Sequence, residues 1–191
     1  MIPVNLSKFD CKRILIVGTS CSGKTKLAEE LSSILNIPHI ELDHLFWKPN
    51  WKMTPREEFY KTVKQKVSAS TWIIDGNYSI VSDLTWQRAT MIIWLNYCFP
   101  RIFLQGFIRT LKRIFFQEKL FGGNRETFQQ SFFSKNSILW WIVYSYSRMK
   151  RKYTDTFSSE QRIAQEKIQL NSPRQKKILL DEMKRYIINK N

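Results

Sequence analysis

One stretch of eight residues constrains the fold of this chain more than any other. Gly18-Thr19-Ser20-Cys21-Ser22-Gly23-Lys24-Thr25 fits the pattern Gly-x-x-x-x-Gly-Lys-[Ser/Thr]. Four consecutive aliphatic residues at 14–17 precede it, as in a strand that is buried on both faces. Apolar residues at helical spacing follow it as far as residue 35. A buried strand, a glycine-containing turn and an amphipathic helix in this order predict a phosphate-binding P-loop.

Each fixed position of this motif has a physical reason. Glycine at 18 and 23 permits backbone angles that a side chain would exclude, so the loop can turn its N–H groups inward around phosphate oxygens. The following helix directs its positive end at the same anion. Lys24 is expected to reach the β- and γ-phosphates, and the Thr25 hydroxyl to bind Mg²⁺. The residues predicted to bind nucleotide are Gly18, Thr19, Ser20, Cys21, Ser22, Gly23, Lys24, Thr25 and Lys26.

Two alternatives stay open at this loop. The motif could be a glycine-rich turn between a strand and a helix that binds nothing. Cys21 could be a small spacer, or the helix N-terminus could lower the pKa of its thiol and make it oxidisable. The strand before the motif and the helix after it favour a P-loop, with Cys21 as a spacer.

Strand-like and helix-like segments alternate along the rest of the chain. Strands are predicted at 39–42, 71–75, 90–95 and 167–170. Helices are predicted at 55–69, 100–117, 137–153 and 173–188. An aromatic loop is expected at 43–54, and the glycines at 122 and 123 predict a mobile segment at 118–135. This alternation predicts one α/β domain, 1–191, with a parallel sheet covered on both faces.

The composition limits the class of protein. The chain is 43% hydrophobic and 25% charged, which excludes a largely disordered chain. Its three cysteines form no close pair, and no signal-peptide pattern precedes residue 12. We therefore expect a cytoplasmic protein with reduced thiols. No apolar run reaches the roughly 20 residues needed to span a bilayer.

Positive charge is concentrated in the second half of the chain. The formal net charge is +15, of which residues 1–100 contribute +3 and residues 101–191 contribute +12. A basic half attracts polyanions such as nucleotide phosphates, nucleic acid or acidic lipid. Charge alone does not choose among these partners.

Several segments together resemble a known family. The chain is similar to the small P-loop kinases of the adenylate kinase and shikimate kinase type. It most resembles the subgroup of DNA topology modulation proteins, which are adenylate-kinase-like. The resembling stretches are 14–25, Pro38-His39-Ile40-Glu41-Leu42-Asp43, Trp72-Ile73-Ile74-Asp75-Gly76-Asn77-Tyr78, 86–88, Gly122-Gly123-Asn124-Arg125-Glu126 and Ser172-Pro173-Arg174.

This resemblance implies a P-loop NTPase three-layer α/β sandwich. Its five parallel strands would have the order 2-3-1-4-5, with helices on both faces and a helical lid at about 117–136. Asp75 would then lie near the P-loop, where it could hold a Mg²⁺-bound water or contact the acceptor. Asp43 could contact acceptor or metal, or act as general base for an acceptor hydroxyl. Alternatively, Asp75 caps a turn and Asp43 is a solvated residue at a strand end.

The resemblance also suggests residues on the acceptor side, namely His44, Asn77, Tyr78 and Arg88. His44 could instead be an ordinary hydrogen-bonded loop residue. Trp47 and Trp51 could stack on a base or simply pack. The run Asp75-Gly76-Asn77-Tyr78 stands where true adenylate kinases have Asp-Gly-Phe-Pro-Arg, so AMP is not indicated as the acceptor.

Arginines are expected to stabilise the charge of a phosphoryl group in transfer. Arg109 and Arg113 are four residues apart and so project from one face of a helix. Arg125 would come from the lid. All three could instead belong to a solvated basic face. The aromatic residues around the lid are expected to be mostly core: Phe115, Phe116, Phe121, Phe128, Phe132, Phe133, Trp140 and Trp141.

These observations predict an ATP- and Mg²⁺-dependent phosphotransferase with a small, nucleotide- or nucleoside-like acceptor. Its predicted catalytic residues are Lys24, Asp43, Asp75, Arg109, Arg113 and Arg125, with Thr25 and Asp75 at the metal. One alternative is an ATP-switched nucleic-acid-binding protein that affects DNA topology, suggested by the subgroup and by the basic run 148–152. Another is a protein that docks on a membrane surface through 99–116.

Overall fold

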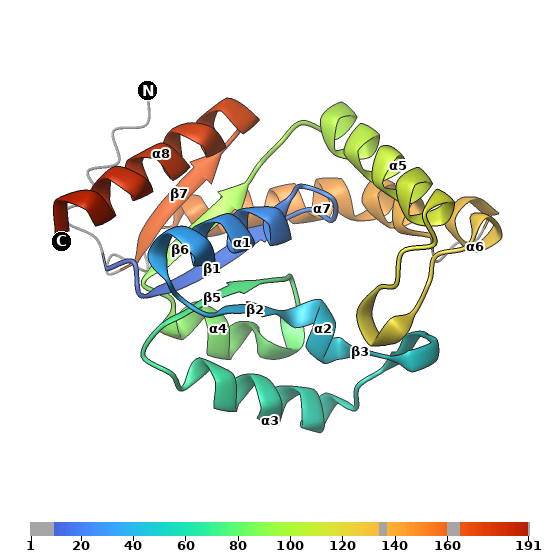
Figure 1. The fold of residues 1–191 in the computed structure, drawn as a ribbon, viewed down its shortest axis with the longest axis horizontal. Helices are drawn as coiled ribbons and strands as arrows, with labels where there is room; N and C mark the ends of the chain where they lie inside the picture. The colour runs from blue at the N-terminus through green and yellow to red at the C-terminus, as the bar shows by residue number, and fades with distance from the viewer. Residues whose placement is uncertain (1–9, 134–136, 160–164, 191) are drawn as a thin grey trace.

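A parallel sheet of five strands forms the centre of the molecule. The computed structural model describes residues 10–133, 137–159 and 165–190. The order of the strands is β2-β5-β1-β6-β7 (Figure 1). Their bounds are β1 (Arg13–Gly18), β2 (His39–Glu41), β5 (Trp72–Asp75), β6 (Met91–Leu95) and β7 (Glu166–Leu170). Counted within this sheet alone, the order is 2-3-1-4-5, as the resemblance implied.

Helices cover both faces of this sheet because its central strands are apolar on both sides. Ile14 and Ile16 face the core beneath α1 (Lys24–Leu35) and α8 (Pro173–Lys190). Leu15 and Val17 alternate to the other face, where α3 (Arg56–Val67) and α4 (Ser82–Arg88) close a second core. The predicted α/β sandwich is therefore confirmed.

Three more helices belong to the second half of the chain. They are α5 (Phe99–Phe115), α6 (Phe128–Phe133) and α7 (Ile138–Ser158). Helix α5 packs against α7. Because Ile142 lies in the first core and Tyr153 in the second, α7 passes from one face of the sheet to the other. Helices α3 and α5 end two residues earlier than predicted, whereas α8 ends two residues later and α7 five residues later.

The loop predicted at 43–54 is wrong, because most of this segment is ordered secondary structure. Helix α2 (Leu42–Phe46) is followed by β3 (Trp47–Lys48), a 3₁₀ turn η2 (Pro49–Trp51) and β4 (Lys52–Met53), and β3 and β4 pair antiparallel. The ring of Phe46 anchors the segment in the core against Phe59 and Tyr78. A second 3₁₀ turn, η3 (Ser79–Val81), follows β5.

The segment between α5 and α7 contains the 3₁₀ turn η4 (Phe121–Gly123) and α6. Asn124, directly after this turn, is buried and tied to the β3–β4 ribbon. Its Nδ2 donates to the carbonyl of Lys48 and its Oδ1 accepts from the N–H of Trp51, both at 3.0 Å. The first half of the predicted lid at 117–136 is thus linked to the β3–β4 ribbon, and its last three residues lie outside the described part of the chain.

The aromatic residues around the lid are less buried than predicted. Five of those expected in the core are exposed: Phe115, Phe116, Phe128, Trp140 and Trp141. Phe121 and Phe132 are half-buried, and the side chain of Phe133 lies outside the description. Helical spacing alone does not say which face of a helix meets the core. Within the described residues, no helix is long and apolar enough to cross a membrane.

Candidate active site

The P-loop joins β1 to α1 with the backbone that its glycines allow. Gly18 has a φ of +149°, and a Cβ there would lie 2.8 Å from the carbonyl oxygen of Leu95 on β6. Gly23 caps α1 in the left-handed region, with a φ of +91°. The N–H groups of the first helical turn have no partner within their own helix, so the loop presents donors at a positive helix end.

Lys24 turns its ammonium group back over the loop. Its Nζ donates to the carbonyls of Gly18 and Thr19, at 3.0 Å each. Burial lowers the pKa of Lys24, although the charges of Asp75 and Asp43 oppose this. A buried ammonium held only by neutral carbonyls and nearby carboxylates is suited to receive a phosphate anion, which would strengthen its charged form.

Oxygen ligands gather beside the P-loop, where β2 and β5 end. The Thr25 hydroxyl donates to Asp75 Oδ2 at 2.7 Å and lies 3.3 Å from Glu41 Oε1. Asp75 is 3% exposed, so this carboxylate is buried against the first turn of α1. Among the described residues, no group of three or more His, Cys, Asp and Glu side chains could hold a metal by itself. A hydroxyl and carboxylates that leave room for phosphate oxygens and water fit Mg²⁺.

Two histidines are hydrogen-bonded to these carboxylates, one to each. His39 Nε2 lies 2.8 Å from Asp75 Oδ1, and His44 Nδ1 lies 2.7 Å from Glu41 Oε2. Burial lowers the pKa of His39, but the hydrogen bond to Asp75 and the charges of Asp75 and Glu41 outweigh it, so the net shift is upward. Burial, and then the charge of Asp75, raise the pKa of Glu41.

Sequence reasoning missed His39 and Glu41 as members of this site. A signal was present, because residues 39 and 41 alternate along the predicted strand and so share one face at its end. His44, predicted on the acceptor side, lies at the exposed border of the site and stacks edge-on against Phe121, with ring centroids 4.8 Å apart.

Asn77 and Tyr78, both predicted on the acceptor side, make different contacts. Asn77 is paired with the backbone of Gly18: its Nδ2 donates to the carbonyl, and its Oδ1 lies 3.4 Å from the N–H. It also accepts from the Tyr153 hydroxyl at 2.9 Å, which ties α7 to the P-loop. Tyr78 donates to Asp43 Oδ1 at 2.5 Å. Burial and the charge of Asp43 raise the pKa of Tyr78, so the phenol stays protonated.

Helix α5 brings Arg109 and Arg113 towards the P-loop. Gly106 on the same helix lies against Cys21, because a Cβ at 106 would be 3.2 Å from the Cys21 Sγ. Arg113 pairs with Glu126 at 3.0 Å, whereas Arg109 Nε is buried and has no hydrogen-bond partner among the described residues. Ser22 Oγ in the loop is likewise buried and unpartnered. Two buried hydrogen-bond donors without a partner at the P-loop fit a site that binds an anion.

The other predicted residues differ in position. Arg125 and Lys26 are exposed, and Ser20 is half-buried. Arg88 lies at the end of α4, just before β6 begins, and its Nη2 lies 3.3 Å from the carbonyl of Ser68. Arg88 therefore sits at the amino ends of the strands, opposite the P-loop. Its assignment to the acceptor side was wrong, since a sequence motif does not tell which edge of the sheet a side chain reaches.

The surroundings of Cys21 oppose an acidic thiol. Burial raises its pKa, and the charges of Arg109, Lys24 and Arg113 only partly counter this. The raised pKa favours Cys21 as a spacer over an acidic, oxidisable thiol. Desolvation outweighs the favourable field, which leaves Cys21 as a packing residue between the loop and α5.

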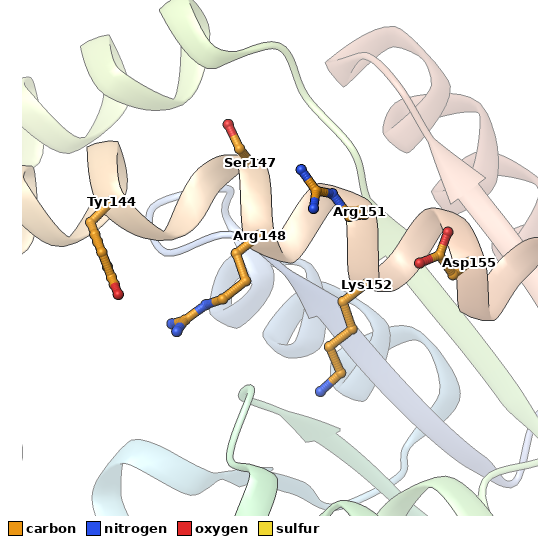
Figure 2. A pocket seen from close by; sticks show the side chains of 6 residues that line it. All are labelled: Tyr144, Ser147, Arg148, Arg151, Lys152 and Asp155. Atoms are coloured by element: carbon orange, nitrogen blue, oxygen red, sulfur yellow. The ribbon is translucent and has the colours of Figure 1, made fainter.

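A cavity of about 450 Å³ runs along α7. Figure 2 shows its lining side chains, with Arg148 and Lys152 pointing to the same side of the helix. The lining residues are Tyr144, Ser147, Arg148, Arg151, Lys152 and Asp155. Three cations and one carboxylate are thus among the lining side chains. The guanidinium of Arg148 lies over the ring of Tyr144, 5.3 Å from its centroid.

Comparison with known proteins identifies the fold. No family model matches the chain, and no curated protein matches it. Shikimate kinase from Bacteroides thetaiotaomicron superposes with a TM-score of 0.54 at 15% identity, over 92% of this chain and 98% of that one. Shikimate kinase from Acinetobacter baumannii, in complex with shikimate, gives 0.52 at 12% identity over 97% of each chain. The chain therefore has the α/β fold of these P-loop kinases.

Proposed function

We propose that the chain is a phosphotransferase that uses ATP and Mg²⁺ and moves the γ-phosphoryl group to a small acceptor. The observation that carries this proposal is the hydrogen bond between Thr25 and Asp75. It joins the residue after the P-loop lysine to the carboxylate at the end of β5, next to Glu41. A P-loop that bound phosphate without a metal would not need a hydroxyl and carboxylates beside it that suit Mg²⁺.

The residues around the loop would share the work of phosphoryl transfer. Lys24 would exchange its two carbonyl partners for β- and γ-phosphate oxygens. Thr25 would bind Mg²⁺ directly and Asp75 would hold its water, and the ion would neutralise phosphate charge. Arg109, with its unpartnered Nε, would stabilise charge on the moving group. Arg113 would do the same after releasing Glu126, and Arg125 would add a third cation if the lid closes.

We assign the role of general base to Asp43. Its partner Tyr78 stays protonated and occupies one carboxylate oxygen, which leaves the other for an acceptor hydroxyl. A phosphate acceptor would need no such base. Replacing Asp43 by Asn should therefore lower transfer to a hydroxyl about 10²- to 10⁴-fold and spare transfer to a phosphate.

The cations of the α7 cavity favour an acceptor that carries negative charge. Helix α7 reaches the P-loop through Tyr153 and Asn77, and Arg148, Arg151 and Lys152 line the cavity along the same helix. A nucleic-acid-binding function is supported by positive charge alone, whereas phosphoryl transfer accounts for the carboxylates, the lysine and the arginines together.

The decisive test is product formation. Purified protein is mixed with ATP, Mg²⁺ and a panel of nucleotides, nucleosides, sugar phosphates and small alcohols, and phosphorylated products are detected by mass spectrometry. Lys24→Ala should abolish turnover, and the matched change Lys61→Ala, at an exposed lysine on α3, should not. Turnover that survives Lys24→Ala would refute the proposal, as would calorimetry showing no Mg²⁺-dependent affinity for any nucleoside triphosphate.

A further inference from the structure

The outward face of α5 has the wrong polarity for a surface helix. Leu104, Ile108, Leu111 and Phe115 follow one another at spacings of four, three and four residues, so they form one stripe along the helix. Their exposed fractions are 57%, 44%, 41% and 81%. The buried residues of the same helix, Ile102, Gly106 and Thr110, occupy the opposite side. A surface helix normally directs polar residues outward.

All charges within this helix are positive. Residues 99–117 contain Arg101, Arg109, Lys112 and Arg113 and neither Asp nor Glu. Arg101 and Lys112 are exposed, and each lies three or four residues from a member of the stripe, so both border it. Figure 1 shows α5 at the outside of the molecule, away from α3 and α4. An apolar stripe bordered by cations fits a partner that offers both apolar groups and negative charge.

We propose that this face of α5 binds an anionic lipid surface. A helix with Leu, Ile and Phe on one side and Lys and Arg beside them lies in the headgroup region, with its apolar stripe among the acyl chains. Its cations then meet the phosphates of acidic lipids. Nucleic acid would use the cations but would leave the apolar stripe in water.

A second copy of the chain fits this face less well. Each copy carries a net charge of +15, so two copies repel one another. The stripe covers about 16 Å of helix axis at 1.5 Å per residue. A specific protein interface needs roughly 20–30 residues on each side. Binding to a lipid surface needs only the area of the stripe.

The two sides of α5 can be tested separately. Its inner side carries Gly106 against Cys21 and brings the charge of Arg109 near that loop residue, whereas the stripe occupies the opposite side of the helix. Substitutions in the stripe should therefore leave ATP binding intact. The proposal does not depend on the proposed reaction.

Vesicle co-sedimentation is the test. The full chain is mixed with vesicles of phosphatidylcholine alone or of phosphatidylcholine with phosphatidylglycerol, at low and high salt. We expect binding to the anionic vesicles that weakens as salt rises. The triple change Leu104→Gln, Ile108→Gln, Leu111→Gln should weaken it at least about tenfold. The matched change Met53→Gln, Ile188→Gln, at exposed apolar residues elsewhere, should have no effect.

Several results would overturn the proposal. They are the absence of binding to anionic vesicles, equal binding to neutral ones, or binding that is lost in Arg101→Gln, Lys112→Gln but kept in the triple variant. A concentration-dependent dimer in sedimentation velocity that the triple change abolishes would assign the face to a second copy instead. Far-UV circular dichroism and ATP binding check that the triple variant is folded. If it is not, the single change Phe115→Gln, at the most exposed position, should still weaken binding.

Discussion

The hydroxyl of Thr25 donates a hydrogen bond to Asp75 Oδ2 at 2.7 Å, although the two residues are fifty positions apart in the sequence. The bond links the first turn of α1 to the end of β5. Parallel pairing of β5 with β1 places the end of β5 beside the P-loop, so the fold itself creates this contact.

Asp75→Asn should impair the Mg²⁺-dependent step. The amide keeps the size of the carboxylate but loses its charge, so a metal-bound water would be held less firmly. We expect turnover to fall about 10- to 100-fold, with a higher Mg²⁺ requirement. Titration of activity with MgCl₂ at saturating ATP measures this. Asp83→Asn, at an exposed aspartate on α4, is the control. An unchanged Mg²⁺ requirement in Asp75→Asn would remove this residue from the metal site.

His39 should make the stability of the fold depend on pH. Its pKa is raised in the folded chain, so its contribution is fully present below about pH 6.5, its usual value, and is lost as pH rises through the raised pKa. Urea unfolding across this pH range, for the wild type and for His39→Gln, provides the measurement. The difference between the two in free energy of unfolding should shrink as pH rises. A difference that is constant with pH would show that His39 does not titrate with folding.

Gly106 should be coupled to Ile142. A Cβ at 106 would lie 2.6 Å from Ile142 Cδ1, and Ile142→Val removes that atom. We expect Gly106→Ala to destabilise the wild type by about 1–3 kcal/mol, despite the better helix propensity of alanine. In the Ile142→Val background the same change should cost less or stabilise. Chemical unfolding of the four proteins gives the coupling energy, and strict additivity would contradict the contact.

Cys21 should resist alkylation. Cys21 is half-buried and the pKa of its thiol is raised, whereas Cys98 is exposed. Because the thiolate is the reactive species, iodoacetamide at neutral pH should modify Cys98 well before Cys21. ATP should slow Cys21 further if it binds the P-loop. Peptide mapping by mass spectrometry at several times follows both residues, and equal rates would mean that the loop opens readily.

The sequence predicted the parts of the site that depend on local pattern. Gly18, Lys24 and Thr25 are fixed by the motif, and Asp75 follows from a strand that ends beside it. The central strands β1, β5 and β6 could be predicted because each consists mainly of one apolar run. The β3–β4 ribbon was missed because two-residue strands carry too little pattern. The short helix α2 was missed because it is held mainly by the burial of two residues, Leu42 and Phe46.

Residues whose role depends on tertiary placement could not be predicted. Arg88 and Arg109 are both basic residues on helices, but only Arg109 belongs to a helix that packs against the P-loop. Phe115 on α5 and Trp140 and Trp141 on α7 have the spacing of core residues but are exposed, because each helix meets the rest of the molecule through another face. Helical periodicity predicts an apolar stripe, but only packing decides whether protein, solvent or another partner contacts that stripe.

The side chain of Asn124 holds two loops from opposite halves of the chain with one amide. Through it, the turn after α5 and the ribbon after α2 are linked on both hydrogen-bonding sides of the amide. If the turn moves inward over a bound nucleotide, the ribbon should move with it as one unit. The donor site and the acceptor site would then close together, so closure should be favoured only when both sites are occupied.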